Sequence, residues 1–313
     1  EVEITRRKLM PLVRGRRILD FWTDWPRALR RATGSQHPAA SMRGRKILDV
    51  TRRGKVLFLK LSGKPERSLA IHLGMSGRLE VGGAGVIKSA SVRHGDKSLR
   101  SYKFVPPPLA RAKRRWVHFR WRLSPRRGSA QAEGQELRLV DPRKFGLVWY
   151  GSPEDLGRDP YLGRLGRDAR GLAYTDFSRT LADASGMIKP YLLRQDRLAG
   201  IGNIIADEAL WRARIHPETS ITHLDLPAHR RLFHGIRKTI RAMLSSGGTT
   251  LRNWGSPDGR SGHYQERRLV YGKAGSPCPR CGAILQRIVI GSRGTTLCPA
   301  CQTVVRGSSV SAA

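Results

Sequence analysis

Hydrophobic and polar positions follow two different periods along this chain. Up to about residue 150, short apolar runs are bounded by Gly, Pro and charged residues, a pattern typical of β-strands. The clearest of these runs lie at residues 46–50, 56–61, 69–73 and 137–140. They predict a β-sandwich or a flattened barrel. One helix is expected ahead of it, over residues 4–12, where Ile4, Leu9 and Leu12 recur at helical spacing.

From about residue 176 the apolar positions recur every three to four residues, which predicts helices. These predicted helices lie at residues 177–184, 190–193, 204–213 and 227–244. Residues 247–267 are rich in Gly and Ser and predict a loop, and residues 307–313 predict a disordered tail. We therefore expect an α+β multidomain protein.

One basic stretch interrupts the first part of the chain. Residues 82–115 contain nine Lys or Arg residues, one acidic residue and a run of three prolines, and they predict an inserted loop. The insert either adds phosphate contacts or has no binding role, and the sequence favours neither. The chain thus divides into a first domain, a linker, a helical domain, a cysteine module and a tail, at residues 1–151, 152–175, 176–267, 268–306 and 307–313.

The four cysteines of the chain form two Cys-x-x-Cys pairs, Cys278 with Cys281 and Cys298 with Cys301. Two such knuckles can converge four thiolates on one tetrahedral Zn²⁺. With four protein ligands and no open position, the metal would be structural, and its binding would stabilise a segment too small to bury its own core. Two disulfides in a secreted protein are the alternative, which is disfavoured because no secretory signal is visible.

The net charge points to a polyanionic partner. Fifty-nine Lys and Arg residues oppose 24 Asp and Glu residues, a formal net charge of +35 on 313 residues. Nucleic acid is the first candidate. A membrane surface is weaker, because the sequence has no apolar run long enough to span a bilayer and no lipidation signal. A solvated basic surface, enlarged by a genome that prefers Arg, is the remaining interpretation.

Two kinds of turn place candidate side chains for DNA. A Gly-rich turn before Asn203 presents backbone N–H groups at a helix N-terminus, a natural cradle for phosphate, to which Asn203 and Lys189 would add donors. Two other turns follow predicted strands and carry Met75, Arg143 and Phe145. Arg reads base edges or phosphates, and Phe stacks on bases. Met75 is either a wedge between bases or a side chain folded onto the core.

Together these motifs resemble the formamidopyrimidine-DNA glycosylase family of base-excision repair enzymes. The resemblance runs in order over nearly the whole chain, apart from the insert and the tail. The motifs that carry it are Glu1-Val-Glu-Ile-Thr-Arg-Arg, Gly54-Lys-Val-Leu, His72-Leu-Gly-Met-Ser-Gly, Asp141-Pro-Arg-Lys-Phe-Gly, Ile188-Lys-Pro, Gly200-Ile-Gly-Asn-Ile-Ile-Ala-Asp-Glu, Gly247-Gly-Thr-Thr-Leu, Val270-Tyr-Gly-Lys and Arg293-Gly-Thr-Thr-Leu-Cys.

The resemblance implies a catalytic β-sandwich at 1–151, a helix-two-turn-helix domain at 176–267 with a lesion-capping loop at 252–267, and a zinc-finger β-hairpin at 268–306. It implies excision of 8-oxoguanine and formamidopyrimidines from double-stranded DNA, followed by β,δ-elimination at the abasic site. One structural Zn²⁺, a monomer without a membrane partner, and a bacterial cytoplasmic location at the nucleoid are the corresponding expectations.

The resemblance also implies roles for single residues. Those expected to fill the void left by a flipped base are Met75, Arg143 and Phe145, with Arg143 pairing the orphaned cytosine. Those expected at DNA phosphates are Lys55, Lys144, Lys189, Asn203 and Arg293, of which Lys55 and Arg293 also count among the catalytic residues. Those expected at the lesion base are Glu1, His263 and Tyr264. His263 and Ile205 stand where Tyr is usual, which leaves the exact lesion preference open.

The start of the sequence departs from the family pattern. The family begins with Pro-Glu-Leu-Pro, and the amine of that proline attacks the deoxyribose C1′ while the next glutamate assists proton transfer. Both residues would precede Glu1, so the chain as given is expected to lack activity. An incomplete sequence is the first explanation, and a truncated or non-catalytic protein the second. Lys55 is a poor substitute, because an unperturbed lysine is almost fully protonated at pH 7.

Three hypotheses follow: a bifunctional glycosylase and abasic-site lyase, a non-catalytic binder of damaged or abasic DNA, and a general zinc-ribbon nucleic-acid protein. The third does not account for Met75, Arg143, Phe145 and Asn203 together. The first two differ in the residues that precede Glu1.

Overall fold

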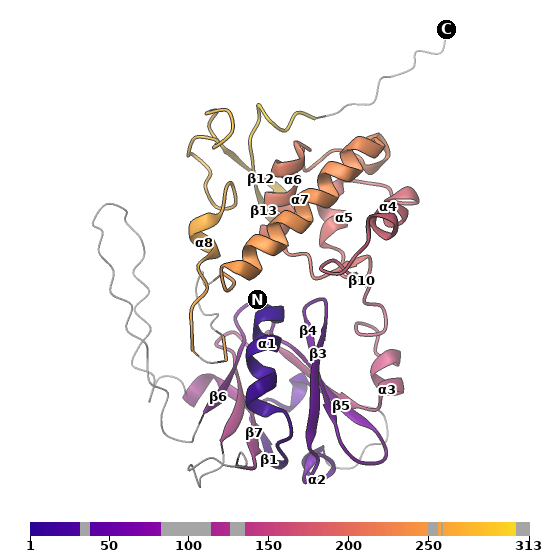
Figure 1. Ribbon diagram of the computed structural model, residues 1–313, viewed down its shortest axis with the longest axis vertical. Helices are drawn as coiled ribbons and strands as arrows, with labels where there is room; N and C mark the ends of the chain where they lie inside the picture. The colour runs from indigo at the N-terminus through magenta and orange to yellow at the C-terminus, as the bar shows by residue number, and fades with distance from the viewer. Residues whose placement is uncertain (32–37, 83–113, 126–134, 250–255, 258, 305–313) are drawn as a thin grey trace, which may run out of the picture. The chain divides into compact units, whose positions relative to one another are not determined.

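The computed structural model of the chain describes residues 1–31, 38–82, 114–125, 135–249, 256–257 and 259–304 (Figure 1). The chain forms two compact units, one of residues 1–163 with 246–263 and the other of residues 164–245 with the segment from Tyr264 onward. Among the described helices, none is both long enough and apolar enough to cross a bilayer.

The first unit is built from two β-sheets (Figure 1). The antiparallel sheet of four strands has the order β1 (Ile18–Thr23), β7 (Val117–Leu123), β8 (Glu136–Val140) and β6 (Arg78–Gly82). The sheet of five strands has the order β2 (Leu29–Arg31), β9 (Leu147–Gly151), β5 (Arg67–His72), β4 (Val56–Leu61) and β3 (Ile47–Arg53), and its β2–β9 pair is parallel. Leu59 from one sheet and Trp121 and Leu139 from the other share one buried core, so the unit is a β-sandwich.

Among the described residues of this unit, three helices accompany the sheets. They are α1 (Val2–Val13), α2 (Pro38–Met42) and α3 (Pro153–Arg158). Helix α1 places Leu9 and Val13 in the core of the sandwich. Its Glu3 is buried and accepts hydrogen bonds from Arg7 and from Arg52 on β3, at 2.8 and 3.2 Å, which ties the helix to the sheet. Short 3₁₀ turns occur at Pro26–Ala28 and Arg114–Trp116.

The second unit is mainly helical. Its helices are α4 (Tyr174–Ala182), α5 (Ile188–Leu193), α6 (Asn203–Ala213), α7 (Leu226–Ser245) and α8 (Tyr264–Arg267), with a 3₁₀ turn at Ile221–His223. Two short parallel strands, β10 (Arg167–Asp168) and β11 (Leu198–Ala199), join its first loop to the turn before α6. Helices α6 and α7 pack closely, because a Cβ on Gly235 of α7 would lie 2.7 Å from the Ala209 carbonyl oxygen of α6. Only glycine allows that approach.

The C-terminal module of this unit is a hairpin flanked by the cysteine knuckles. Strands β12 (Gln286–Ile290) and β13 (Arg293–Leu297) pair antiparallel through a turn with positive φ at Gly291 and Ser292. A small buried cluster of Trp211, Val270, Leu285 and two of the cysteines joins the module to α6.

The predicted β-rich first part and helical second part are confirmed, and so is the α+β class. The predicted helix 4–12 appears as α1, and the predicted loop at 247–267 contains a short helix, α8, at its end. Most of the insert at 82–115, residues 250–255 and 258 of the loop, and the tail lie outside the described residues.

Candidate functional site

The first loop of interest joins β5 to β6 and carries Met75 at its tip. The Gly77 N–H donates to the Leu73 carbonyl at 2.9 Å, which closes the turn. Gly74 has a φ of +64°, a conformation that favours glycine. Met75 is 70% exposed, so it does not fold back onto the sandwich core.

The second loop joins β8 to β9 and is organised by one buried carboxylate, Asp141. Asp141 accepts backbone N–H groups from Arg143 at 3.2 Å and from Phe145 and Gly146 at 2.7 Å each. The loop therefore wraps around this carboxylate and directs its side chains outward. Arg143 and Phe145 are exposed, and the guanidinium of Arg143 lies 4.5 Å from the centre of the Phe145 ring.

The same carboxylate holds the first loop. The Ser76 hydroxyl donates to Asp141 Oδ1 at 2.5 Å, and both residues are buried. The two loops also touch, since a Cβ on Gly74 would lie 2.6 Å from the Phe145 backbone. Met75, Arg143 and Phe145, predicted as one group from separate motifs, are thus brought together on two loops joined at Asp141. The sequence signal for Asp141 was a lone acid directly after an apolar strand.

Lys55 and His72 lie close to the Met75 loop. Lys55 is partly buried in the turn between β3 and β4. Burial, together with the charge of Lys55, lowers the pKa of His72 to about 4. His72 is therefore neutral at pH 7, and its Nδ1 accepts the Gly74 N–H at 3.0 Å, which supports the Met75 loop.

Three further predicted residues lie in this unit. Lys144 is exposed, and its ammonium lies 5.9 Å from the centre of the Trp25 ring. Glu1 is exposed just before α1. The side chain of His263 is exposed, and its backbone N–H donates to the Ser246 carbonyl at 2.9 Å. Lys144 thus neighbours Arg143 on the Asp141 loop, whereas Glu1 and His263 lie on other segments of the chain.

In the second unit, Asn203 begins α6 and reaches the β12–β13 hairpin. Its Nδ2 donates to the Gly294 carbonyl at 2.8 Å, next to the exposed Arg293. Its Oδ1 is buried and has no hydrogen-bond partner among the described residues. This hydrogen bond brings the N-terminus of α6 next to Arg293, whereas Lys189, predicted beside Asn203, lies buried.

Lys189 differs from its prediction as a phosphate-binding residue. It is fully buried on α5, and its Nζ lies 2.5 Å from Asp207 Oδ1 of α6. It also donates to the Thr295 hydroxyl at 2.6 Å, and Asp207 accepts the Thr296 N–H at 2.9 Å. Burial lowers the pKa of Lys189 and raises that of Asp207, and each charge partly offsets the shift of the other. Lys189 thus has no surface for a phosphate; it fixes the hairpin that carries Arg293.

Tyr264 also differs from its prediction as a lesion contact. It is fully buried, and its hydroxyl donates to Glu208 Oε2 at 3.5 Å. Burial, with Glu208 adding to it, raises the pKa of Tyr264 to about 12. Its helix, α8, is too short for the sequence to show which face is buried, so a packing residue was taken for a binding one.

Glu208 was part of a quoted motif but was given no role. It is fully buried and accepts the backbone N–H groups of Leu269 at 2.9 Å, Val270 at 2.8 Å and Tyr271 at 3.0 Å. These bonds attach the entry of the cysteine module to α6. Adjacent acids at Asp207 and Glu208 in an otherwise apolar helix were the signal that could have found it.

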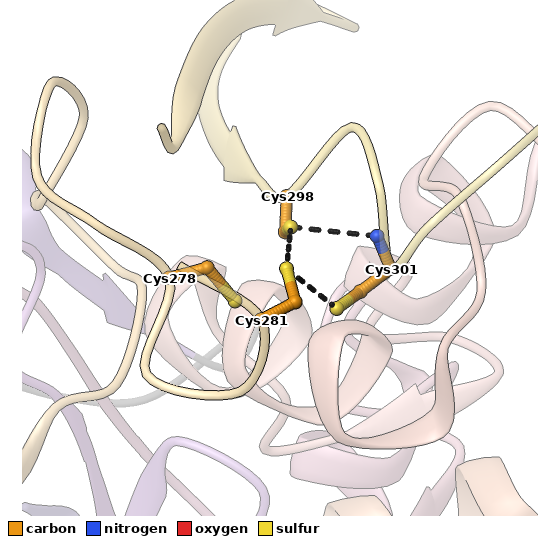
Figure 2. Close-up of side chains that lie close together, drawn as sticks. All are labelled: Cys278, Cys281, Cys298 and Cys301. Atoms are coloured by element: carbon orange, nitrogen blue, oxygen red, sulfur yellow. Dashed lines mark hydrogen bonds between the residues drawn. The ribbon is translucent and has the colours of Figure 1, made fainter. Parts of the chain in front are cut away.

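The four cysteines converge as predicted (Figure 2). Their sulfur atoms all lie within 4.8 Å of one another, and the Cys281 sulfur lies 3.5 Å from that of Cys298 and 3.4 Å from that of Cys301. A tetrahedral site with Zn–S bonds of about 2.3 Å has sulfur atoms about 3.8 Å apart. The donor set and its spacing therefore fit one Zn²⁺. The Trp211 Nε1 donates to Cys278 Sγ at 3.4 Å, a contact that orients this ligand from α6.

Known proteins resemble the chain over most of its length. Residues 1–148 match the formamidopyrimidine-DNA glycosylase N-terminal domain, residues 156–254 match the H2TH domain of that enzyme, and residues 275–304 match the zinc finger found in FPG and IleRS. The zinc-finger match and the four converging thiolates agree, so the module binds one structural zinc ion.

Curated and solved relatives cover nearly the same length. The chain is 35% identical over 277 residues to the formamidopyrimidine-DNA glycosylase of Heliobacterium modesticaldum, with 88% of each covered. The crystal structure of the MutM (Fpg) protein from Thermus thermophilus matches with a TM-score of 0.76 at 33% identity and covers 98% of both chains. Wild-type Lactococcus lactis Fpg in complex with N7-benzyl-Fapy-dG containing DNA matches with a TM-score of 0.76 at 28% identity, over 97% of this chain and 98% of the other.

Proposed function

The chain belongs to the formamidopyrimidine-DNA glycosylase family and is a DNA glycosylase of base-excision repair, and from this premise we propose that it removes oxidised purines from double-stranded DNA. The proposed substrates are formamidopyrimidines and 8-oxoguanine. A Fapy-dG derivative is the lesion in the DNA of the Lactococcus lactis complex, which supports the substrate class. A non-catalytic damage binder is the less favoured alternative, because the relatives are named as glycosylases.

The observation that carries this proposal is the pair of loops joined at Asp141. Met75 is 70% exposed and Phe145 is 47% exposed, and two large apolar side chains held in water are unfavourable unless a partner covers them. A stacked duplex with one base flipped out offers an apolar gap of that kind. We propose that Met75 and Phe145 fill this gap, while Arg143 donates to the orphaned base.

Phosphate contacts would position the duplex for this step. The proposed contacts come from Lys55 in the first unit and from Asn203, Arg293 and the N-terminus of α6 in the second. Backbone N–H groups at a helix N-terminus favour an anion. Lys144 is a proposed helper because it is exposed beside Arg143. Glu1 and His263 remain proposed contacts of the lesion base. Lys189 and Tyr264 are buried, and we assign them to the stability of the fold instead of to DNA binding.

The chemical step needs a nucleophile at the deoxyribose. We propose that it is the secondary amine of an N-terminal proline in a Pro-Glu-Leu-Pro segment ahead of Glu1. The amine forms a bond to C1′ and the glycosidic bond breaks, so that the base leaves with the bonding electron pair and takes up a proton. The amine then loses its proton and the C1′–O4′ bond of the sugar ring breaks, with a proton passing to O4′, which gives an iminium. This iminium permits β- and then δ-elimination of the flanking phosphates, which is the abasic-site lyase activity. The glutamate after the proline would transfer protons.

Borohydride trapping tests this proposal. The substrate is a duplex with 8-oxoguanine opposite cytosine, and the two proteins are the chain as given and the same chain with Pro-Glu-Leu-Pro ahead of Glu1. Borohydride reduces an iminium to a stable covalent adduct. We expect an adduct with the extended chain only. Binding by both chains without an adduct from either would contradict the proposal and favour the non-catalytic alternative.

The proposed setting follows from the relatives. They are bacterial proteins, and we propose that this chain acts on nucleoid DNA in the bacterial cytoplasm. We also propose that it acts as a monomer.

A further inference from the structure

The second unit contains a basic pocket at the end of α6 that is distant from Asn203. The pocket has a volume of about 530 Å³. The cationic and titratable side chains that line it, here called the basic pocket residues, are Arg212, Arg230, Arg231, His234, Lys238 and Arg280. Trp211, Gly235 and Leu269 complete the lining, so none of the lining residues is acidic.

The charges of this pocket have no acidic residue among the lining residues to offset them. Some exposed arginines elsewhere in the unit are paired with acids, for example Arg167 with Asp176 at 2.8 Å and Arg194 with Asp196 at 2.6 Å. Helix α7 carries five Lys or Arg residues between Leu226 and Ser245 and no Asp or Glu. Like charges held together repel one another, and an anion in the pocket would relieve that repulsion.

One guanidinium in the pocket is held in a fixed orientation. Arg280 stacks on the Trp211 ring, with its Cζ 4.0 Å from the ring centre, and donates through Nη2 to the Arg212 carbonyl at 3.4 Å. Its Nη1 has no hydrogen-bond acceptor among the described residues. Buried donors usually have an acceptor, and phosphate oxygens match the fork of a guanidinium.

The pocket is separate from the proposed phosphate contacts at Asn203 and the N-terminus of α6. Asn203 begins α6 and Arg212 lies nine residues later, so the two positions are about 14 Å apart along the helix. We propose that the basic pocket binds backbone phosphates of a second DNA segment, which is undamaged, while the lesion-binding residues hold the first. This inference goes beyond the proposed function and rests on it only for the identity of the polyanion as DNA.

A capture experiment tests the second DNA site. The extended chain is first bound to an immobilised duplex with an abasic-site analogue, and capture of a fluorescent undamaged duplex is then measured over a range of salt concentrations. The pocket variant is Arg231→Gln with Lys238→Gln. The matched control is Arg237→Gln with Arg241→Gln, which removes the same charge from exposed positions of the same helix outside the pocket.

We expect the wild type and the control variant to capture the second duplex and the pocket variant to capture it about tenfold more weakly. The slope of log affinity against log salt concentration should fall by about 1.8 in the pocket variant, because each lost phosphate contact contributes about 0.9. Absence of capture by the wild type, or equal losses in the two variants, would overturn the inference. So would displacement of the second duplex by polyglutamate as readily as by tripolyphosphate, since that result indicates an acidic protein partner. Base excision is measured in parallel, so that a failure of the proposed function is seen separately.

Discussion

The two units hold their functional surfaces in different ways. In the first unit, the lone carboxylate of Asp141 accepts hydrogen bonds from two loops, and the side chains proposed to reach DNA stay exposed. In the second, the buried ion pair of Lys189 and Asp207 fixes the backbone of the hairpin that carries Arg293. Hydrogen bonds to one acceptor thus hold the two loops that carry the proposed wedge, whereas the buried ion pair fixes the backbone next to Arg293. We therefore expect damage to the first unit to slow base flipping and damage to the second to weaken DNA binding.

The largest expected effect comes from the zinc site. Cys298→Ser removes one of four thiolates, and structural zinc supplies about 10–16 kcal/mol of folding free energy in zinc-finger peptides. We expect zinc content to fall from one ion per chain to none, with loss of DNA binding and retention of the sandwich fold. Metal analysis and circular dichroism check this, and wild type depleted by a chelator and then reloaded serves as the control. Full zinc content in the variant would contradict the assignment.

The next effect concerns the buried ion pair. Asp207→Leu leaves the charge of Lys189 buried without its partner, and we expect a loss of about 3–5 kcal/mol in the free energy of unfolding. The double variant Lys189→Met with Asp207→Leu removes both charges and should recover most of that loss. Urea unfolding of both variants measures it. A double variant as unstable as the single one would show that the charges do not act as a pair.

A smaller effect is expected at the hub of the first unit. Asp141→Asn replaces an acceptor with a donor opposite backbone N–H groups, which should cost about 1–3 kcal/mol of stability. Excision should slow, because the Met75 and Phe145 loops lose their shared anchor, while affinity for undamaged DNA stays the same. Asp20→Asn is the matched control, since Asp20 also accepts a backbone N–H in the same unit but is exposed. Equal kinetics in both variants would argue against the hub.

A further effect of similar size, which develops gradually with pH, comes from His72. The folded state lowers the pKa of His72 from 6.5 to about 4, so the unfolded state binds a proton first as the pH falls. The stabilisation is complete above about pH 6.5 and is lost between there and pH 4, by about 1–3 kcal/mol. The difference in unfolding free energy between wild type and His72→Gln should shrink over this range. A constant difference from pH 7 to pH 4 would contradict the assignment.

Local patterns in the sequence were sufficient for much of the fold. The short apolar run at residues 56–61 predicted β4, and the helical spacing from 204 to 213 predicted α6 to within one residue. The order of the strands within each sheet could not be predicted from the sequence. For example, β6 and β7 both pair with β8, although the insert separates β6 from β7 in the sequence. Register between distant strands depends on packing that a single run of residues does not encode.

The candidate site divides in the same way. Cysteine spacing predicted the metal site, because knuckles are local. Lys189 and Tyr264 were assigned to the surface, yet contacts with residues far along the chain bury them. Glu208 was given no role for the same reason, since the backbone groups of Leu269, Val270 and Tyr271 become its neighbours only in the folded chain. Asp141 accepts mainly from backbone groups of its own loop, and only its bond to Ser76 depends on a distant segment.

The exposed Met75 gives the most direct test of the central claim that the first unit supplies the wedge. Met75→Ala in the extended chain is compared with Met187→Ala, because Met187 is also an exposed methionine, at 47% exposed. Single-turnover excision of 8-oxoguanine and affinity for undamaged duplex are measured for both. We expect Met75→Ala to slow excision about 10–100-fold, since flipping costs a few kcal/mol, with unchanged affinity for undamaged duplex and no effect of Met187→Ala. Equal losses of excision and of undamaged-duplex affinity in Met75→Ala would contradict the account.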